Sequence, residues 1–93
     1  MRRGRRVSSQ HLVLHFMTRP EPSAPRAGFV VGKVVGNSVV RHRVIRQLRH
    51  LVREQLPTLP AGLDVVIRGL AGAQEADLRA ELEPLLAKVA ARA

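Results

Sequence analysis

The sequence predicts a small α+β domain in which one β-sheet packs against helices. Three observations support this class: three short apolar stretches suited to strands, a long amphipathic stretch between the second and third of them, and a helical pattern near the C-terminal end. With 93 residues, 45% of them apolar and 25% charged, the chain has the size and composition of one folded domain with one modest core. We therefore expect residues 1–93 to form a single domain.

The predicted strands cover residues 11–17, 27–35 and 63–67. In the first, Leu12, Leu14 and Phe16 share one face by strict alternation. The second contains Gly28 and Gly32, where we expect a bulge or a close backbone approach. Residues 18–26 contain three prolines and predict a loop. If the second and third strands are parallel neighbours, the helix between them is a crossover connection.

Two helices are predicted. The first begins where Asn37 or Ser38 can cap it and ends at Leu56, the residue before a proline. The second covers residues 74–91, where leucines recur at spacings of three and four, and Pro84 should kink or divide it. The acidic residues near this helix should form its exposed face: Glu75, Asp77, Glu81 and Glu83.

The first helix has two chemically opposite faces. At about 100° per residue, its apolar side chains fall in one arc of roughly 160°, as expected for a helix that faces a core. This apolar arc contains Val40, Val44, Ile45, Leu48, Leu51, Val52, Gln55 and Leu56. The opposite arc contains His42, Arg43, Arg46, Arg49, His50 and Arg53. These side chains predict an exposed surface for a polyanion.

The net charge of +9 is concentrated in the first half of the chain. Residues 1–53 carry 12 Lys and Arg and one acid, whereas residues 54–93 carry four Lys and Arg and six acids. Arginine far outnumbers lysine, and its planar guanidinium can bind phosphate through two hydrogen bonds. The balance therefore favours nucleic acid over a generic acidic partner. We expect residues 1–6, with four arginines, to form a basic arm.

Several classes of function are disfavoured. The chain has no cysteine, which excludes disulfides, thiolate metal sites and cysteine nucleophiles. The four histidines lack the neighbours of a metal site, and we predict none. No constellation of catalytic side chains is visible, so the residues themselves indicate a binding protein. No apolar run has the length of a signal peptide or a membrane span, and a membrane-surface helix lacks its usual aromatic edge. We therefore expect a cytoplasmic protein.

The stretch GNSVVRHRVIRQLRHLV, residues 36–52, resembles the signature of the bacterial ribonuclease P protein subunit. In that family Gly-Asn-Ala-Val is followed by Arg-Asn-Arg and then by further basic residues. A Gly-Arg-Arg near the start and a glycine-rich strand ending in lysine agree as well. The resemblance covers most of the chain, and its motif is specific because it sets seven residues at defined spacings.

The resemblance implies a fold of the ribosomal protein S5 domain 2 type, with a left-handed β-α-β crossover against the usual right-handed rule. It implies a subunit of an RNA-catalysed endoribonuclease that removes the 5′ leader from precursor transfer RNA. The partners would be the catalytic RNA, which binds the Mg²⁺ ions, and the precursor transfer RNA, with no obligate protein partner. A structural RNA-binding protein of ribosomal type would have a similar size and charge, and only the signature spacing argues against it.

Carried over by position, the resemblance assigns RNA contacts to the signature arginines and to the lysine before them. With the neighbouring cations, the expected RNA-binding set is Lys33, Arg41, His42, Arg43, Arg46, Arg49 and Arg53. A leader site would include His15, where the family often has an aromatic residue, together with Arg5 and Arg6.

The sequence departs from the family pattern in four places, one of them Val34, where a second lysine is common. His42 replaces an asparagine, and Ile45 replaces a basic residue. The family's N-terminal helix, which forms one wall of the leader cleft, has no counterpart here, and we expect either a late start or an upstream segment. Leader binding is therefore the least supported part of the comparison.

Overall fold

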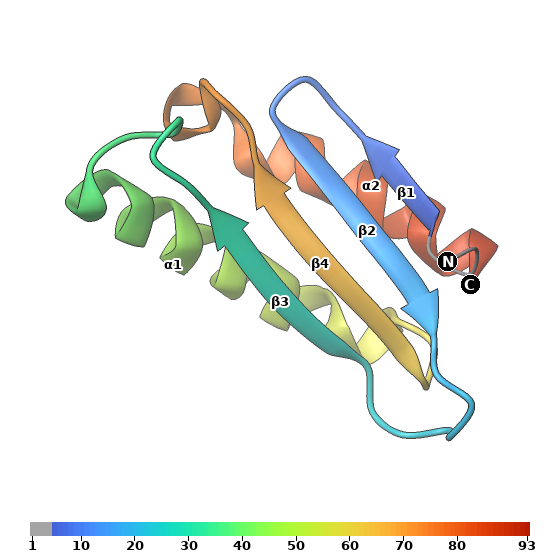
Figure 1. The fold of residues 1–93 in the computed structure, drawn as a ribbon. Helices are drawn as coiled ribbons and strands as arrows, with labels where there is room; N and C mark the ends of the chain where they lie inside the picture. The colour runs from blue at the N-terminus through green and yellow to red at the C-terminus, as the bar shows by residue number, and fades with distance from the viewer. Residues whose placement is uncertain (1–4) are drawn as a thin grey trace.

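The computed structural model describes residues 5–93 as a four-stranded sheet with two α-helices packed on one face (Figure 1). The strands are β1 (Arg5–Ser8), β2 (Leu12–Thr18), β3 (Arg26–Val31) and β4 (Leu63–Gly69). The helices are α1 (Ser38–Gln55) and α2 (Leu78–Arg92), and two short 3-10 turns occupy Leu56–Thr58 and Ala73–Glu75. The predicted α+β class is confirmed, with one strand more than the sequence indicated.

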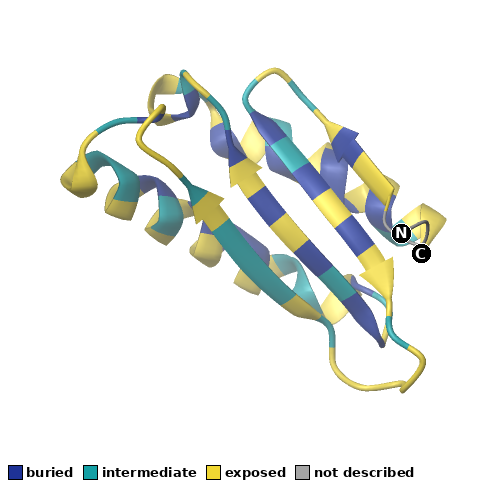
Figure 2. Ribbon diagram, in the orientation of Figure 1, coloured by how far each residue is buried: buried dark blue, intermediate teal, exposed yellow. Residues whose placement is uncertain are grey.

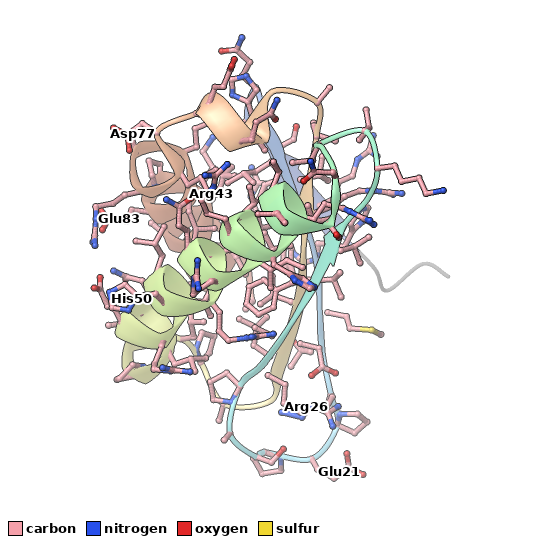
Figure 3. The ribbon with its side chains drawn as sticks, turned by 90° about the vertical axis from the view of Figure 1, so that its left-hand side faces the viewer. Glu21, Arg26, Arg43, His50, Asp77 and Glu83 are labelled. Carbon is pink, nitrogen blue, oxygen red and sulfur yellow. The ribbon has the colours of Figure 1, made fainter. Side chains whose placement is uncertain are left out.

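The strand order is β1-β2-β4-β3, and only the β3–β4 pair is parallel. In Figure 1 the arrowheads of β3 and β4 point upward, and β4 lies to the right of β3. Helix α1, which connects the two strands, lies behind the sheet. Figure 3, turned by 90°, also shows both helices on one side of the edge-on sheet. The β3-α1-β4 connection is therefore left-handed, as expected from the resemblance.

The prediction that residues 1–6 form a basic arm is wrong for the last two of them, which lie in strand β1. Arg5 and Arg6 belong to this strand, which pairs with β2 in the register Arg5↔Phe16 to Ser8↔Val13. The strand forms because Val7 is buried in the core, 7% exposed, and because the hairpin closes with a bond from the Ser9 amide to the Leu12 carbonyl, 2.8 Å. The other residues of the predicted arm, 1–4, lie outside the described part of the chain.

Strand β3 is shorter than predicted, because a turn follows Val31. The Val35 amide donates to the Gly32 carbonyl at 3.1 Å, which closes this turn, and the Val35 side chain is buried. Gly36 then brings the backbone close to the start of α1. A Cβ at Gly36 would lie 2.8 Å from Cγ1 of Val40, so only glycine fits without a shift.

Helix α1 begins and ends as predicted. The Asn37 side chain accepts a hydrogen bond from the Val40 amide at 3.0 Å, and the helix stops one residue before Leu56-Pro57. Figure 2 shows buried and exposed residues alternating around it. The buried residues all come from the predicted apolar arc: Val44, Leu48, Leu51 and Val52.

Helix α2 begins later than predicted, after the Asp77 side chain caps it by accepting from the Ala80 amide at 3.1 Å. Pro84 lies inside this helix and does not divide it, contrary to one of the predicted outcomes. An interior proline costs about 3 kcal/mol. Each buried leucine side chain contributes about 1.5–3 kcal/mol, and Leu82, Leu85 and Leu86 are all buried around the proline. Burial therefore outweighs the lost backbone bond.

One hydrophobic core lies between the sheet and the two helices. The largest fully buried side chains come from β2, β4, α1 and α2, and include Leu14, Ile67, Leu48 and Leu82. Within residues 5–93, no helix is both long enough and apolar enough to cross a bilayer.

Candidate nucleic-acid interface

The cations of α1 project from the side of the helix that faces away from the core. Figure 3 looks onto this helix, with Arg43 labelled on it. Along α1 the basic side chains His42, Arg43, Arg46, Arg49, His50 and Arg53 are exposed, and Lys33 is exposed in the turn before the helix. We call this set, without His50 and with Arg41 added, the cationic face. Helix α1 therefore carries a row of basic side chains on a backbone that is held in place by the core.

The arginines of the cationic face form no ion pair with a carboxylate among the described residues. The one acid near the end of α1, Glu54, is turned toward α2 instead. It accepts from Arg79 at 2.9 Å and lies 3.1 Å from His50, and the Arg79 hydrogen bond lowers its pKa. His50 therefore belongs to an acidic cluster and not to the cationic face. The positive charge of the face remains uncompensated.

Arg41 differs from its neighbours because it is half-buried in the first turn of α1. Its Nε atom is buried and has no hydrogen-bond partner within residues 5–93. An unpaired buried donor costs free energy unless a partner is supplied. Because this atom has no access to solvent, an RNA acceptor could pair with it only after the Arg41 side chain moves.

The sheet face opposite the helices is not covered by any helix of the described chain (Figure 1). Because paired residues point to the same side of a sheet, the register defines which side chains share this open face. One row runs Arg6, His15, Val66 and Gly28, and the next runs Ser8, Val13, Arg68 and Val30. Arg6 and His15, both expected at a leader site, thus lie directly opposite each other.

A hollow of about 440 Å³ lies at the β1 side of the sheet. Its lining residues are Arg5, Arg6, His15, Phe16, Met17, Asp64 and Val66. Met17 and Val66 are exposed apolar side chains, 43% and 39%, on which a flat group could lie. Arg5 pairs with Phe16 and so points to the helix side of the sheet at its edge, where its guanidinium carbon is 5.7 Å from the Phe16 ring centroid. Arg5 therefore lines the hollow from the edge of the sheet, whereas Arg6 and His15 line it from the open face.

Arg68 is a candidate that the sequence analysis missed. It is exposed on β4, in the middle of the open face, and has no carboxylate partner among the described residues. Its position becomes apparent only from the pairing of β4 with both β2 and β3. The alternation of residues 63–69 was the only available signal, since it separates Arg68 from the buried Ile67.

At the end of the open face next to the β2–β3 loop, Asp64, which also lines the hollow, holds two arginines. Arg26 donates from Nε and a terminal nitrogen to Asp64, at 2.9 and 3.0 Å, and Arg19 approaches the same group at 3.5 Å. The Arg26 hydrogen bond holds the pKa of Asp64 below its usual value. Arg19 also donates to the Ala24 carbonyl at 2.6 Å. This cluster fixes the loop between β2 and β3 and compensates the charge there.

The prediction that Glu81 lies on the exposed face of the last helix is wrong, because its side chain is mostly buried. Its carboxylate accepts from the Ser9 hydroxyl and from the His11 amide, 2.9 Å, and lies 2.6 Å from Nδ1 of His11. Burial acts to raise the pKa of Glu81, but the hydrogen bonds from Ser9 and His11 outweigh it and lower the pKa. The cluster ties the β1–β2 hairpin to α2. In contrast, Asp77 and Glu83 lie on the solvent side of α2 (Figure 3).

The described residues do not fit a magnesium site. Among them, no group of three or more His, Cys, Asp or Glu side chains is placed to hold a metal ion. The carboxylates of Asp64, Glu54 and Glu81 already accept hydrogen bonds from other side chains.

An uncovered sheet face beside a helix with uncompensated arginines defines a small α+β protein that binds a polyanion. Comparison with known sequences identifies the family to which this chain belongs. Residues 1–90 match the family model described as Ribonuclease P. The ribonuclease P protein component of a Nocardioides species is 46% identical, over 98% of this chain and 82% of the relative. That of Acidothermus cellulolyticus is 43% identical over 96% and 78%. The chain therefore belongs to the ribonuclease P protein family, whose members are subunits of an endoribonuclease that processes transfer RNA.

Solved structures agree on the fold. The ribonuclease P protein of Staphylococcus aureus superimposes with a TM-score of 0.85 at 22% identity, covering 92% of this chain and 81% of that one. The protein from Thermotoga maritima, solved with a fluorophenyl thiourea, gives 0.79 at 24% identity, covering 89% and 83%. The four-stranded sheet and both helices of the described residues thus follow the fold of this family. The family match also favours the endoribonuclease subunit over the ribosomal alternative.

Proposed function

We propose that the cationic face of α1 docks on the catalytic RNA subunit of ribonuclease P. The observation that carries this proposal is the set of signature arginines that project from one helix without carboxylate partners among residues 5–93. Arginines already bound to acids, such as Arg26 and Arg79, lie outside the cationic face. A phosphate backbone that meets the face can therefore bind without displacing an internal ion pair.

We further propose that the open face of the sheet receives the 5′ leader of precursor transfer RNA. A single strand needs cations along its backbone and flat or apolar surfaces beneath its bases. Arg6 and Arg68 supply the first, and His15, Met17 and Val66 supply the second. Arg5 is a weaker candidate than predicted, because its guanidinium stacks on Phe16 at the edge of the sheet.

In this proposal the protein carries no step of the chemistry. We assign the Mg²⁺ ions of cleavage to the RNA subunit. The contribution of the chain is to neutralise phosphates and to hold substrate and RNA subunit together. No obligate protein partner is needed for this role, and the site of action is the cytoplasm, where precursor transfer RNA is processed.

Reconstitution with the cognate catalytic RNA tests the proposal. At low Mg²⁺ concentration, the wild-type protein should accelerate removal of the 5′ leader. The double variant Arg46→Ala/Arg49→Ala should lose most of this acceleration, whereas Lys88→Ala/Arg92→Ala, with the same loss of charge on α2, should keep it. Failure of the wild-type protein to stimulate cleavage would contradict the assignment, and equal effects of the two double variants would contradict the docking surface.

A further inference from the structure

Each of the two aromatic rings in the chain lies against an arginine. The sequence has two phenylalanines and no tryptophan or tyrosine. The guanidinium carbon of Arg49 is 5.6 Å from the centroid of the Phe29 ring, and that of Arg5 is 5.7 Å from the Phe16 ring. At such distances a cation over a ring face is attracted by the ring's quadrupole. Arg49 is the only cationic-face arginine of the described chain with such a ring partner.

The Phe29 ring is a fixed support. Phe29 lies on β3 opposite Ile67, on the helix side of the sheet, and packs half-buried against the core. Arg49 comes from the fourth turn of α1 and is exposed. The ring is thus held by the core on one side and covered by the guanidinium on the other.

Two ways of holding an arginine coexist in this protein. Asp64 binds Arg26 through two N–H groups, and Glu54 and Glu83 bind Arg79. These carboxylates occupy the donors and compensate the charge, which raises the pKa of both arginines. A ring, in contrast, orients the plane of the guanidinium and leaves its N–H edge and its charge available.

We propose that Phe29 is a positioning residue for Arg49, holding its guanidinium in place for a phosphate of the RNA subunit. The inference rests on the proposed docking of α1 on RNA. A free arginine loses side-chain freedom when it binds, and one already stacked on a ring loses less. Arg49 is then a preorganised contact, whereas Arg43, Arg46 and Arg53 must be ordered by the RNA itself.

A double-mutant cycle in the affinity for the catalytic RNA, at fixed salt, tests the inference. Phe29→Leu should weaken binding by about two- to fivefold in the wild-type background. It should have no further effect in an Arg49→Ala background, and its full effect in an Arg46→Ala background. Phe29→Tyr, which keeps the ring, should bind like the wild type. A purely structural role for Phe29 would instead give Phe29→Leu the same effect in the Arg49→Ala and Arg46→Ala backgrounds.

Four outcomes would overturn the inference. An equal effect of Phe29→Leu in the Arg49→Ala and Arg46→Ala backgrounds, or a Phe29→Tyr protein as weak as Phe29→Leu, would show that Phe29 does not act through Arg49. If Arg49→Ala weakens binding while Phe29→Leu does not, the docking surface stands and only the inference fails. An Arg49→Ala protein that binds like the wild type would contradict the role of Arg49 in docking itself.

A measurement on the free protein covers the case in which Phe29→Leu does not fold. The ring should shift the NMR resonances of the Arg49 δ-methylene protons upfield, in the wild type and in Phe29→Tyr alike. Resonances at unshifted positions would mean that the stack is absent in solution and would overturn the inference.

Discussion

The cationic face should make the affinity for RNA depend strongly on salt concentration. The face contains five arginines on α1 that have no carboxylate partner within residues 5–93: Arg41, Arg43, Arg46, Arg49 and Arg53. If each neutralises one phosphate, the log–log slope of affinity against salt should be about −4. Raising monovalent salt from about 50 to 200 mM should then weaken binding about 250-fold.

Removing two of these arginines should flatten the slope. Arg46→Ala/Arg49→Ala should give a slope of about −2.4, so that the same change in salt weakens binding about 30-fold. Filter binding to the catalytic RNA across a salt series measures both slopes. Lys88→Ala/Arg92→Ala is the matched control on α2, with an expected slope near −4.

The same variant should remain folded. An exposed side chain such as Arg46 contributes within about 0.5 kcal/mol, and the Arg49 stack on Phe29 adds about 0.5–1 kcal/mol. The unfolding free energy should therefore fall by less than about 1.5 kcal/mol in urea titrations. An unchanged slope, or a loss of stability well beyond this bound, would refute the reasoning that these side chains serve a ligand rather than the fold.

Further predictions concern the fold and the open face. Gly36→Ala should lower the unfolding free energy by about 1–3 kcal/mol, because its Cβ would meet Val40; an unchanged urea midpoint would contradict this. Glu81 has a lowered pKa, so its stabilising contribution is present above about pH 4.5 and is lost as the pH falls through the folded-state value. Glu81→Gln should accordingly lower stability at pH 7 and reduce the acid dependence, and a parallel pH profile would argue against it. Arg68→Ala should weaken binding of precursor transfer RNA but not of mature transfer RNA, and equal losses would place Arg68 outside the leader site.

Helix α1 could be predicted from the sequence in both position and faces. Its periodicity, the cap at Asn37 and the stop before Pro57 are local signals, and each is strong on its own. Because the apolar arc selects the core side, the exposure of Arg43, Arg46 and their neighbours followed from the same pattern. The left-handed crossover came only from the family resemblance, since no local signal specifies it.

Strand β1 and the Glu81 cluster could not be predicted in this way. Val7 is the one apolar residue of a strand that is otherwise Arg and Ser, and the strand forms because β2 offers it an edge. The contacts of Glu81 with Ser9 and His11 join residues 70 or more positions apart. Arg68 likewise required the sheet register. Such features depend on contacts between segments that are far apart in the sequence. Hydrophobic alternation and secondary-structure propensity do not specify these contacts.

Directed cleavage of the RNA from a probe on α1 tests the central claim most directly. The sequence has no cysteine, so Val39→Cys gives a single attachment site for a hydroxyl-radical source. Val39 is 72% exposed in the first turn of α1 and lies by angle among the cations of the face. In the reconstituted complex, we expect localised cleavage of the catalytic RNA from this position and none from a probe at Ala87→Cys, an exposed position on α2. Cleavage from the α2 probe alone would contradict the docking of the cationic face.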